Sequence, residues 1–415
     1  MQRSTWRHRA LVCVVFALSA ASSRAELVIG TTFSPSATAH LISVWAAQDG
    51  KPVRTVNRTS GALLRAMQQP DAEGIDLILS SSPVLFQQMT AAGVLALNPI
   101  PRVAQSERLL PAFLRETTTV VALSGYGVLS HRERLRQAGV SLPATWDALA
   151  DPRLRGLVVM STPSRSDTNL LMVETILQQR GWSKGWALLM AIGGNLLTIS
   201  SRSFGVSHYI ETGVGAAGPV IDNYANVLIP AKPLAFRYFQ NFTSAPTYIA
   251  ISAASRNKAE AERFITFLLS QKGQEAFADA ATGKYPVTLL PATHPLAAQQ
   301  KRLLAQPSLD YGVLFARQRL VQELFDRAIT YRLMQLQDDW RQLDEAEART
   351  GRVLSDVRAL LTAVPVTPAQ ATDAKYVGSF AEEHGAGARE SEVVRWLAFF
   401  ERQHKAAVAI MSSLP

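Results

Sequence analysis

The chain has 415 residues, of which 47% are hydrophobic, and a formal net charge of +9. This length exceeds what one hydrophobic core usually supports, so we expect at least two domains. The charge is mild and its cations are dispersed, which excludes the basic stripe of a nucleic-acid-binding face. The single cysteine, Cys13, lies in the first apolar run and leaves the rest of the chain without disulfides or thiolate metal sites.

The N-terminal residues have the pattern of an export signal. Arginines precede an apolar run, Ala10–Ala21, that is too short to cross a bilayer as a helix. Ser23-Arg24-Ala25 then places small residues at the two positions that a signal peptidase reads. We expect residues 1–25 to be a signal peptide cleaved before Glu26, a periplasmic location, and no membrane insertion after cleavage. An uncleaved signal anchor is the alternative.

Strand and helix patterns alternate from Leu27 onward. Three apolar runs are each followed by a break and then by a helical pattern. The runs are Leu27–Phe33, Val53–Val56 and Ile75–Leu79, and the helices are Ala37–Gln48, Ala62–Gln69 and Val84–Ala92. Repeated units of this kind predict a parallel sheet with helices on its faces, the α/β class.

A second set of elements follows a long β-rich run, Thr117–His131, which glycines interrupt. Trp146–Gly156 then leads into a strand. The elements predicted after it are a strand at Leu157–Met160, helices at Asp167–Arg180 and Lys184–Ile192, and strands at Gly213–Ile221 and Ala245–Ile251.

The stretch Thr247–Val287 reads as a strand, an amphipathic helix with the letters FITFLLSQKGQ, and a second helix that closes on Gly-Lys-Tyr-Pro-Val. Together with Trp146–Gly156, WDALADPRLRG, it resembles the type II periplasmic binding proteins of extracellular solute-binding family 1. The resemblance is to the branch that takes ferric ion and phosphorylated solutes. It implies two α/β lobes that close on a ligand like a Venus flytrap and catalyse no reaction. It also implies that Thr117–His131 crosses from one lobe to the other.

On this basis we expect a first lobe over residues 26–123, a second lobe over 124–245, a return to the first lobe over 246–291, and an all-helical C-terminal extension over 292–415. In the extension, Leu314–Ala348 is predicted as one long amphipathic helix. Helices at Arg352–Ala363 and Arg389–Met411 follow, joined by a linker at Pro365–Gly387. The extension either packs on the lobes or binds a partner, and we expect it to serve the output of the protein and not ligand capture.

Open α/β sheets bind ligands at the carboxyl ends of their strands, where helix N-termini present N–H groups and a partial positive charge. Residues at these positions in both lobes are rich in hydroxyls and include two arginines, a set that suits an oxyanion. The predicted ligand-binding residues are Thr32, Ser34, Arg58, Thr59, Ser60, Ser81, Ser82, Ser164, Arg165, Ser166, Asp222, Asn223 and Tyr224. Each hydroxyl could instead only cap its helix, and Asp222 could cap the next turn. Arg165 could pair with Asp167 on the surface.

Other motifs carry less weight. Gly213–Gly218 matches the letters GxGxxG, but it follows a helical pattern and opens a strand, the reverse of the dinucleotide-binding order. The histidines lack the spacing of metal ligands. Ferric-binding members of the family use two adjacent tyrosines, whereas Tyr224 is followed here by Ala225. We therefore expect no cofactor, no metal and no enzymatic activity.

The expected function is that of a periplasmic solute-binding or sensor protein that captures a small anionic solute, most simply a phosphorylated organic acid or sugar. Resemblance to a regulatory branch of the family implies an inner-membrane sensor kinase complex as partner, which would induce uptake of the solute. One alternative is the binding protein of an ABC importer, which would deliver sugar phosphate, phosphonate or Fe³⁺ to a permease. A structural scaffold is the remote alternative, and no nucleic-acid partner is expected.

Overall fold

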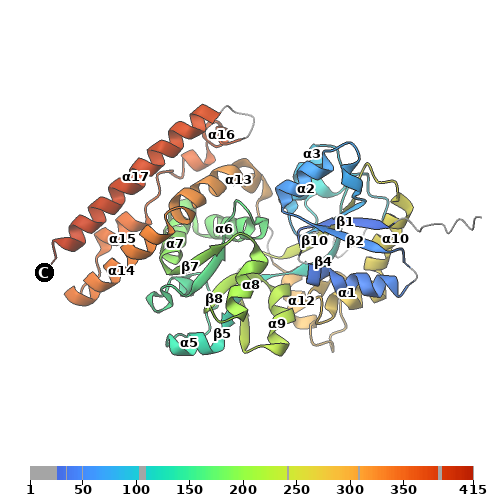
Figure 1. Cartoon of the computed structure of the whole chain (residues 1–415), viewed down its shortest axis with the longest axis horizontal. Helices are drawn as coiled ribbons and strands as arrows, with labels where there is room; N and C mark the ends of the chain where they lie inside the picture. The colour runs from blue at the N-terminus through green and yellow to red at the C-terminus, as the bar shows by residue number, and fades with distance from the viewer. Residues whose placement is uncertain are drawn as a thin grey trace, which may run out of the picture.

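The computed structural model describes residues 26–33, 35–48, 50–101, 109–240, 243–306, 309–381 and 386–414. Figure 1 shows two α/β lobes side by side, with most helices of the C-terminal part beside the second lobe. The two-lobed α/β class with a helical extension is therefore as the sequence predicted.

The described part of the first lobe contains a six-stranded sheet. In spatial order its strands are β11 (Tyr285–Pro286), β4 (Thr119–Ser124), β10 (Ala245–Ile251), β3 (Leu77–Ser80), β1 (Leu27–Thr31) and β2 (Val53–Asn57). β1 pairs in parallel with both β2 and β3, whereas β10 is antiparallel to β3 and β4. The carboxyl ends of β1, β2 and β3 therefore lie at one edge of the sheet.

Helices cover both faces of this sheet, namely α1 (Pro35–Ala46), α2 (Ser60–Met67), α3 (Pro83–Ala91), α10 (Lys258–Leu269) and α11 (Gln271–Ala278). Because successive strand residues point to opposite faces, β1 serves two cores at once. Leu27 and Ile29 pack in one cluster with Trp45 and Phe264, and Val28 packs in the cluster on the other face.

The second lobe holds a five-stranded sheet in the order β7 (Leu196–Ser200), β6 (Val158–Ser161), β8 (Ala217–Ile221), β5 (Tyr126–His131) and β9 (Leu234–Tyr238), all within the described residues. Its helices are α5 (Arg132–Gln137), α6 (Asp167–Arg180), α7 (Trp182–Asn195), α8 (Ser203–Glu211) and α9 (Asp222–Leu228). β7 and β9 were not predicted from the sequence. Strand β6 runs parallel to β7 and β8, so its carboxyl end faces the same way as theirs.

The β-rich run Thr117–His131 contributes to both sheets. Its first part is β4 of the first sheet and its second part is β5 of the second, with Gly125 between them. The chain returns to the first sheet between β9 and β10. Gly127 must be glycine because a Cβ there would overlap the backbone carbonyl of Arg237 in the neighbouring strand β9.

The C-terminal extension is helical, as expected. It comprises α12 (Ala297–Leu304), α13 (Tyr311–Phe325), α14 (Leu333–Thr350), α15 (Ser355–Thr362), α16 (Ala374–Gly378) and α17 (Ala386–Ser412). The prediction of one continuous helix over Leu314–Ala348 is wrong, because a π-helical turn at Asp326–Thr330 separates α13 from α14. Short 3₁₀ turns elsewhere lie at Ala72–Gly74, Ala112–Leu114, Asp147–Ala150, Pro152–Leu154, Ile229–Ala231 and Gln370–Thr372.

The linker predicted at Pro365–Gly387 is a packed segment where it is described. Val366 and Phe380 are buried, and the carbonyl of Val366 accepts a 2.7 Å hydrogen bond from the indole N–H of Trp182 in α7. The ring of Phe380 stacks on Trp396 of α17 at 5.2 Å. This correction follows from contacts with residues distant in sequence, which the local Pro, Ala and Thr content does not reveal.

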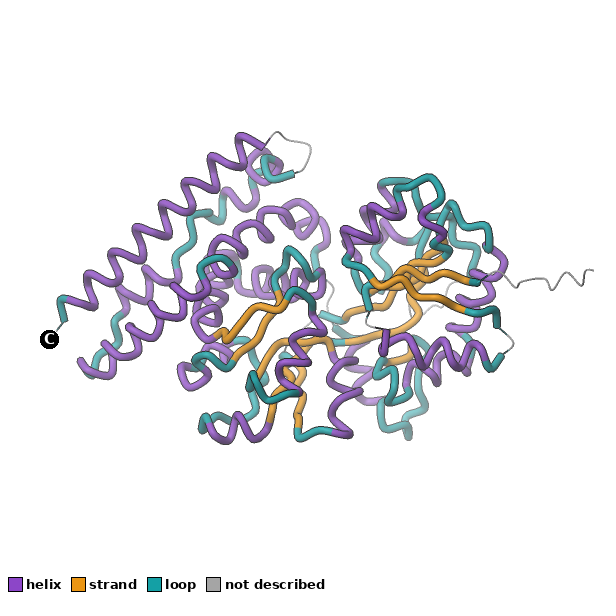
Figure 2. The backbone as a smooth tube through the Cα atoms, in the orientation of Figure 1, coloured by secondary structure: helices purple, strands orange, loops and turns teal. Residues whose placement is uncertain are grey.

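Helices α13, α14 and α15 dock on α6 and α7 of the second lobe, whereas α12 packs on β4 of the first. Figure 2 shows the same arrangement with helices and strands coloured apart. α14 lies so close to α7 that a Cβ on Gly193 would be 2.6 Å from the side chain of Leu336. On α6, Glu174 is fully buried and receives two hydrogen bonds from Arg317 of α13, of 3.0 and 2.9 Å. Among the described helices, none combines the length and apolar character that spanning a membrane requires.

Candidate functional site

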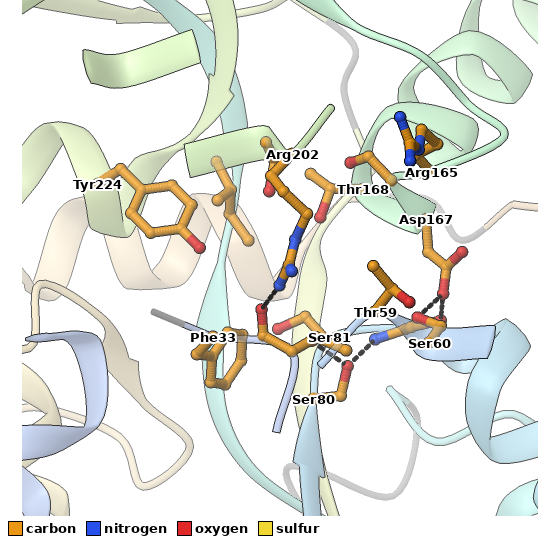
Figure 3. Close-up of a pocket in the computed structure, with 15 residues that line it drawn as sticks. Phe33, Thr59, Ser60, Ser80, Ser81, Arg165, Asp167, Thr168, Arg202 and Tyr224 are labelled. Carbon is orange, nitrogen blue, oxygen red and sulfur yellow. Dashed lines mark hydrogen bonds between the residues drawn. The ribbon is translucent and has the colours of Figure 1, made fainter. Parts of the chain in front are cut away.

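A polar cleft lies between the two lobes, at the carboxyl ends of strands from both sheets (Figure 3). This is the position at which open α/β sheets bind ligands. The residues that line it are Thr32, Phe33, Thr59, Ser60, Ser80, Ser81, Ser82, Arg165, Ser166, Asp167, Thr168, Arg202, Ser203, Ile221 and Tyr224. Of the predicted ligand-binding residues, the structure brings together Thr32, Thr59, Ser60, Ser81, Ser82, Arg165, Ser166 and Tyr224.

The first-lobe side of the cleft consists of hydroxyl groups that also cap helices. Thr59 Oγ1 accepts the Ala62 N–H at the start of α2, and Ser82 Oγ accepts the Leu85 N–H at the start of α3, at 3.4 and 3.0 Å. A hydroxyl that accepts from its helix still has a proton to donate. The capping role and a ligand-binding role are therefore compatible, and two helix N-termini point their partial positive charge at the cleft.

The second-lobe side repeats this arrangement at the start of α6. Ser166 caps the helix by accepting the Asn169 N–H at 3.3 Å. Arg165 is exposed at the rim and makes no ion pair with any described residue. The surface pair with Asp167, which the sequence left open, does not form, because Asp167 has other partners.

The Asp167 carboxylate reaches across the cleft to the first lobe. Its Oδ2 accepts hydrogen bonds of 2.5 Å from Ser60 Oγ at the start of α2 and of 2.5 Å from Ser82 Oγ at the start of α3. A negative group thus sits where two helix N-termini and two hydroxyls converge, which is the environment of an anion site. About 40 Å³ of space remains among the lining side chains, room for water but not for an organic phosphate.

Arg202 is a cleft residue that the sequence analysis missed. It precedes α8, and its Nη2 donates across the cleft to the backbone carbonyl of Thr32 at 3.2 Å and to Asn57 Oδ1 at 3.5 Å. Partial burial lowers the pKa of its guanidinium, which remains charged at neutral pH because the ordinary pKa is so high. The signal was present, since Ser200–Ser203 repeats the hydroxyl-and-arginine pattern, but β7 before it had not been identified as a strand.

Two predicted residues point elsewhere. Arg58 forms an ion pair of 2.7 Å with Glu73 in the first lobe and does not line the cleft; its side chain is 35% exposed. Ser164 is exposed on the far side of its loop, where it bonds to Thr162 Oγ1 at 3.0 Å. Ser34, also predicted, lies outside the described residues.

Asp222 and Asn223 are buried below the cleft and do not line it. The Asp222 carboxylate accepts the Gly125 N–H at 2.7 Å and the Tyr238 hydroxyl at 3.0 Å, so it contacts the point where the chain crosses between lobes. Burial raises the pKa of Asp222 to about 7, against the opposing effect of the Lys284 ammonium. Asp222, predicted as a ligand-binding residue, therefore lies instead against the segment that joins the two lobes.

Lys284 belongs to the same buried group. Its Nζ donates to Ser124 Oγ at 3.2 Å and lies 4.6 Å from the ring of Phe33, which lines the cleft. Burial lowers the pKa of Lys284 to about 8, and the negative charge of Asp222 acts in the other direction. The floor of the cleft is thus in direct contact with an ionisable hinge.

Larger hollows of about 580 and 650 Å³ lie over Leu289 and Leu290 in the first lobe. Their walls are mainly apolar and lack the convergent hydroxyls and arginines that fix a polar ligand. The cleft between the lobes is therefore the better candidate site. Among the described residues, no group of three or more His, Cys, Asp or Glu side chains is placed to hold a metal ion.

Comparisons with known proteins agree with this architecture. The chain is 49% identical over 391 residues to the phosphoglycerate transport regulatory protein PgtC of Salmonella typhimurium, covering 94% of this chain and 97% of that one. The same protein of Salmonella typhi matches equally. Because this match extends over the helical extension as well as the lobes, the relatives share the whole organisation of the chain.

Solved structures show the same fold at lower identity. The periplasmic binding protein AfuA of Actinobacillus pleuropneumoniae, with fructose-6-phosphate bound, has a TM-score of 0.62 at 19% identity, covering 72% of this chain and 98% of its own. Iron-bound HitA of Pseudomonas aeruginosa has a TM-score of 0.54 at 16% identity, covering 68% and 92%. Residues 72–311 match the family described as bacterial extracellular solute-binding protein. This chain belongs to the bacterial extracellular solute-binding protein family.

Proposed function

We propose that this protein captures a small phosphorylated organic acid, with phosphoglycerate as the leading candidate, in the cleft between its lobes. The observation that carries the proposal is the Asp167 carboxylate, held by Ser60 and Ser82 at the N-termini of two helices. The protein's own anion fits this cradle, so a phosphate group that displaced it would find the same donors.

The charges around the cradle favour an anion with more than one negative group. Arg202 spans the cleft and Arg165 lies at its rim, so two arginines border the hydroxyl-lined space. Guanidinium matches the geometry of both phosphate and carboxylate, the two groups that a phosphorylated organic acid carries. The name of the PgtC relatives, at 49% identity, supports phosphoglycerate among such acids.

Iron is the weaker alternative. Ferric-binding members of the family use two adjacent tyrosines, whereas Tyr224 is followed here by Ala225. Iron-bound HitA shares the fold alone. We therefore propose a metal-free site and no enzymatic activity.

For the output, we propose signalling to an inner-membrane sensor that governs uptake of the solute. The word regulatory in the relatives' name favours this role over delivery to an ABC permease. Both outputs use a closed state that the ligand stabilises, because a ligand shifts the population toward the conformation it binds better. We also propose export to the periplasm with cleavage between Ala25 and Glu26, which the N-terminal sequence of the purified protein will test.

Isothermal titration calorimetry of the mature protein with 3-phosphoglycerate tests the ligand. Glycerate, inorganic phosphate, fructose-6-phosphate and Fe³⁺ serve as comparison ligands. We expect 3-phosphoglycerate to bind more tightly than glycerate or phosphate alone, since each lacks one of the two anionic groups. Binding of Fe³⁺ with no response to any phosphate ester would refute the proposal. Crosslinking in membranes to a sensor kinase, as against a permease, separates the two outputs.

A further inference from the structure

The loop that carries Arg165 and Ser166 into the cleft is held from behind by the helical extension. This ligand loop, residues 162–166, joins β6 to α6. On its inner side Thr162 Oγ1 lies 3.0 Å from Ser164 Oγ and accepts the Ser164 N–H at 3.3 Å, so the Thr162 hydroxyl organises the loop. The same hydroxyl donates to Oδ1 of Asp326 in the extension, at 2.6 Å.

Asp326 is placed for this contact by an irregularity in its own helix. It is the first residue of the π-helical turn Asp326–Thr330, and its carbonyl accepts the Tyr331 N–H at 2.9 Å, five residues on. A π turn inserts a residue and re-aims the side chains around it, and such turns occur often at functional sites. Asp326 is 8% exposed, and Thr330 Oγ1 donates to the same Oδ1 at 2.7 Å, so its side chain is fixed from two directions.

The helix before the π turn is also fastened to the ligand loop and to the helix that follows it. Gln322 of α13 donates to the carbonyl of Pro163 in the loop at 3.3 Å. Earlier in α13, Arg317 forms the buried double hydrogen bond with Glu174 of α6. Since α6 begins with Asp167, the extension contacts both the loop and the helix that present the second-lobe side of the cleft.

We infer that Asp326 is a positioning residue of the ligand cleft, and that the extension is part of ligand capture because Asp326 holds Thr162 and with it the loop of Arg165 and Ser166. This inference rests on the cleft being the site of the proposed function. It reverses the sequence-based expectation that the extension serves the output alone. Loss of the Asp326–Thr162 contact frees the loop and leaves its cleft residues less well placed for an anion.

Coupling of this kind is reciprocal. If the extension orders the ligand loop, then a ligand that orders the loop must stabilise the extension around the π turn by the same free energy. The Thr162–Asp326 hydrogen bond is thus a physical contact through which occupancy of the cleft reaches the helices of the extension. A partner that bound those helices would in turn alter ligand affinity.

The test is a double-mutant cycle in the full mature chain, with 3-phosphoglycerate as the probe in calorimetry. The variants are Asp326→Ala, Thr162→Val and the combination. Loss of a hydrogen bond to a charged group predicts about tenfold weaker binding for each single variant. The combined variant should bind no more than about twofold worse than either single variant, because both remove one shared contact. Asp326→Asn keeps an oxygen acceptor of the same shape and should restore affinity to within a few-fold of wild type.

The matched control is Asp344→Ala. Asp344 of α14 also joins the extension to the second lobe, through a 2.5 Å ion pair with Arg155, but Arg155 is not in the ligand loop. We expect this control to lower the unfolding temperature without weakening 3-phosphoglycerate binding. Equal weakening by Asp344→Ala and Asp326→Ala would show a general effect of the interface and overturn the inference.

Hydrogen exchange without ligand separates this inference from the proposed function. In the Asp326→Ala and Thr162→Val variants, the amides of residues 162–168 should exchange faster than in wild type. In the Asp344→Ala variant, the same amides should exchange at the wild-type rate. Unchanged exchange in both loop variants would overturn the inference whatever the ligand proves to be. If wild type fails to bind 3-phosphoglycerate but the loop amides respond as expected, the proposed ligand is wrong and the positioning role stands. Thr162→Val carries the test if Asp326→Ala does not fold.

Discussion

Asp167 in the second lobe accepts a 2.5 Å hydrogen bond from Ser82 Oγ in the first lobe, and this contact helps to hold the cleft closed on itself. The carboxylate occupies the donors that an incoming anion requires, and the space beside it is about 40 Å³. A ligand must therefore displace Asp167 from Ser82 before it can use that hydroxyl. The internal carboxylate also repels a negative ligand as it approaches.

The first prediction is that Asp167→Asn tightens binding of 3-phosphoglycerate. The amide retains the shape of the side chain but removes a negative charge from a site for anions, so we expect affinity to rise by roughly tenfold, on the scale of one charge-assisted contact. Calorimetry at constant ionic strength measures this change. Asp147→Asn, which removes a carboxylate paired with Arg180 on the surface of the same lobe, is the control and should leave affinity unchanged. Weaker binding by Asp167→Asn would mean that the carboxylate instead accepts a hydroxyl of the ligand.

The second prediction distinguishes two arginines. Arg202→Ala should weaken 3-phosphoglycerate binding by roughly ten- to hundredfold, because a partly desolvated guanidinium contributes about 1.5–3 kcal/mol through a charge-assisted hydrogen bond. Arg58→Ala should change affinity by less than about twofold, since Arg58 pairs with Glu73 and does not line the cleft. Titration calorimetry measures the affinity of both variants for 3-phosphoglycerate. The assignment fails if the two variants lose affinity equally.

The third prediction concerns pH and the hinge. Burial raises the pKa of Asp222 from an ordinary value of 3.8 to about 7, so the folded protein holds a proton that the unfolded chain has released. The stability that this proton contributes is fully present below pH 3.8 and is lost as pH rises through about 7. The free energy of unfolding in urea should therefore fall between about pH 4 and 7. In Asp222→Asn this decline should be shallower, because the variant has no proton to release at that site. Equal slopes in the two proteins would contradict the assignment.

The fourth prediction is that the extension is integral to the stability of the second lobe. Arg317→Ala leaves the Glu174 carboxylate buried without its partner, which should lower the free energy of unfolding by about 3–5 kcal/mol. Replacing both partners, as Glu174→Gln with Arg317→Met, should recover much of this loss, since neither buried charge remains. Urea denaturation measures both effects. Arg341→Ala, which removes an exposed arginine of α14 paired with Asp338 and Glu345, is the control and should cost no more than about 1 kcal/mol.

Much of the fold follows from local sequence patterns. The alternation of apolar runs and helical patterns after Leu27 predicted β1, β2 and β3 and the helices that follow them. Each predicted run forms a strand of the first sheet. The glycine-interrupted run Thr117–His131 was correctly expected to cross between the lobes. Strand β7, LLTIS, was missed because it follows directly on α7, which ends at Asn195, so no break in the sequence separates the helix from the strand.

The cleft was predicted in outline but not in its charges. The hydroxyl residues at the strand ends are also the N-caps of the helices that follow, and N-caps can be recognised from the local sequence. Which of Arg58 and Arg202 lines the cleft depends on contacts between residues distant in the sequence. Glu73 sits in a turn with a φ of +51°, which places its carboxylate on Arg58, while Arg202 reaches the cleft only because the second lobe faces the first. Neither relationship is visible in the residues around the arginine concerned.

The outer helices of the extension, α14, α15 and α17, pack on α7 of the second lobe and on one another, which has a mechanical consequence. Helix α17 alone has 27 residues, about 40 Å at the rise of an α-helix, and its far end points away from the first lobe in Figure 1. Whatever rotation the two lobes make about the segment at Gly125, this arm sweeps an arc that grows with its distance from the pivot, by roughly 7 Å at its tip for each 10° over an arm of that length. A label near Ser412 paired with one on the first lobe would therefore read small changes in the cleft as large changes in distance.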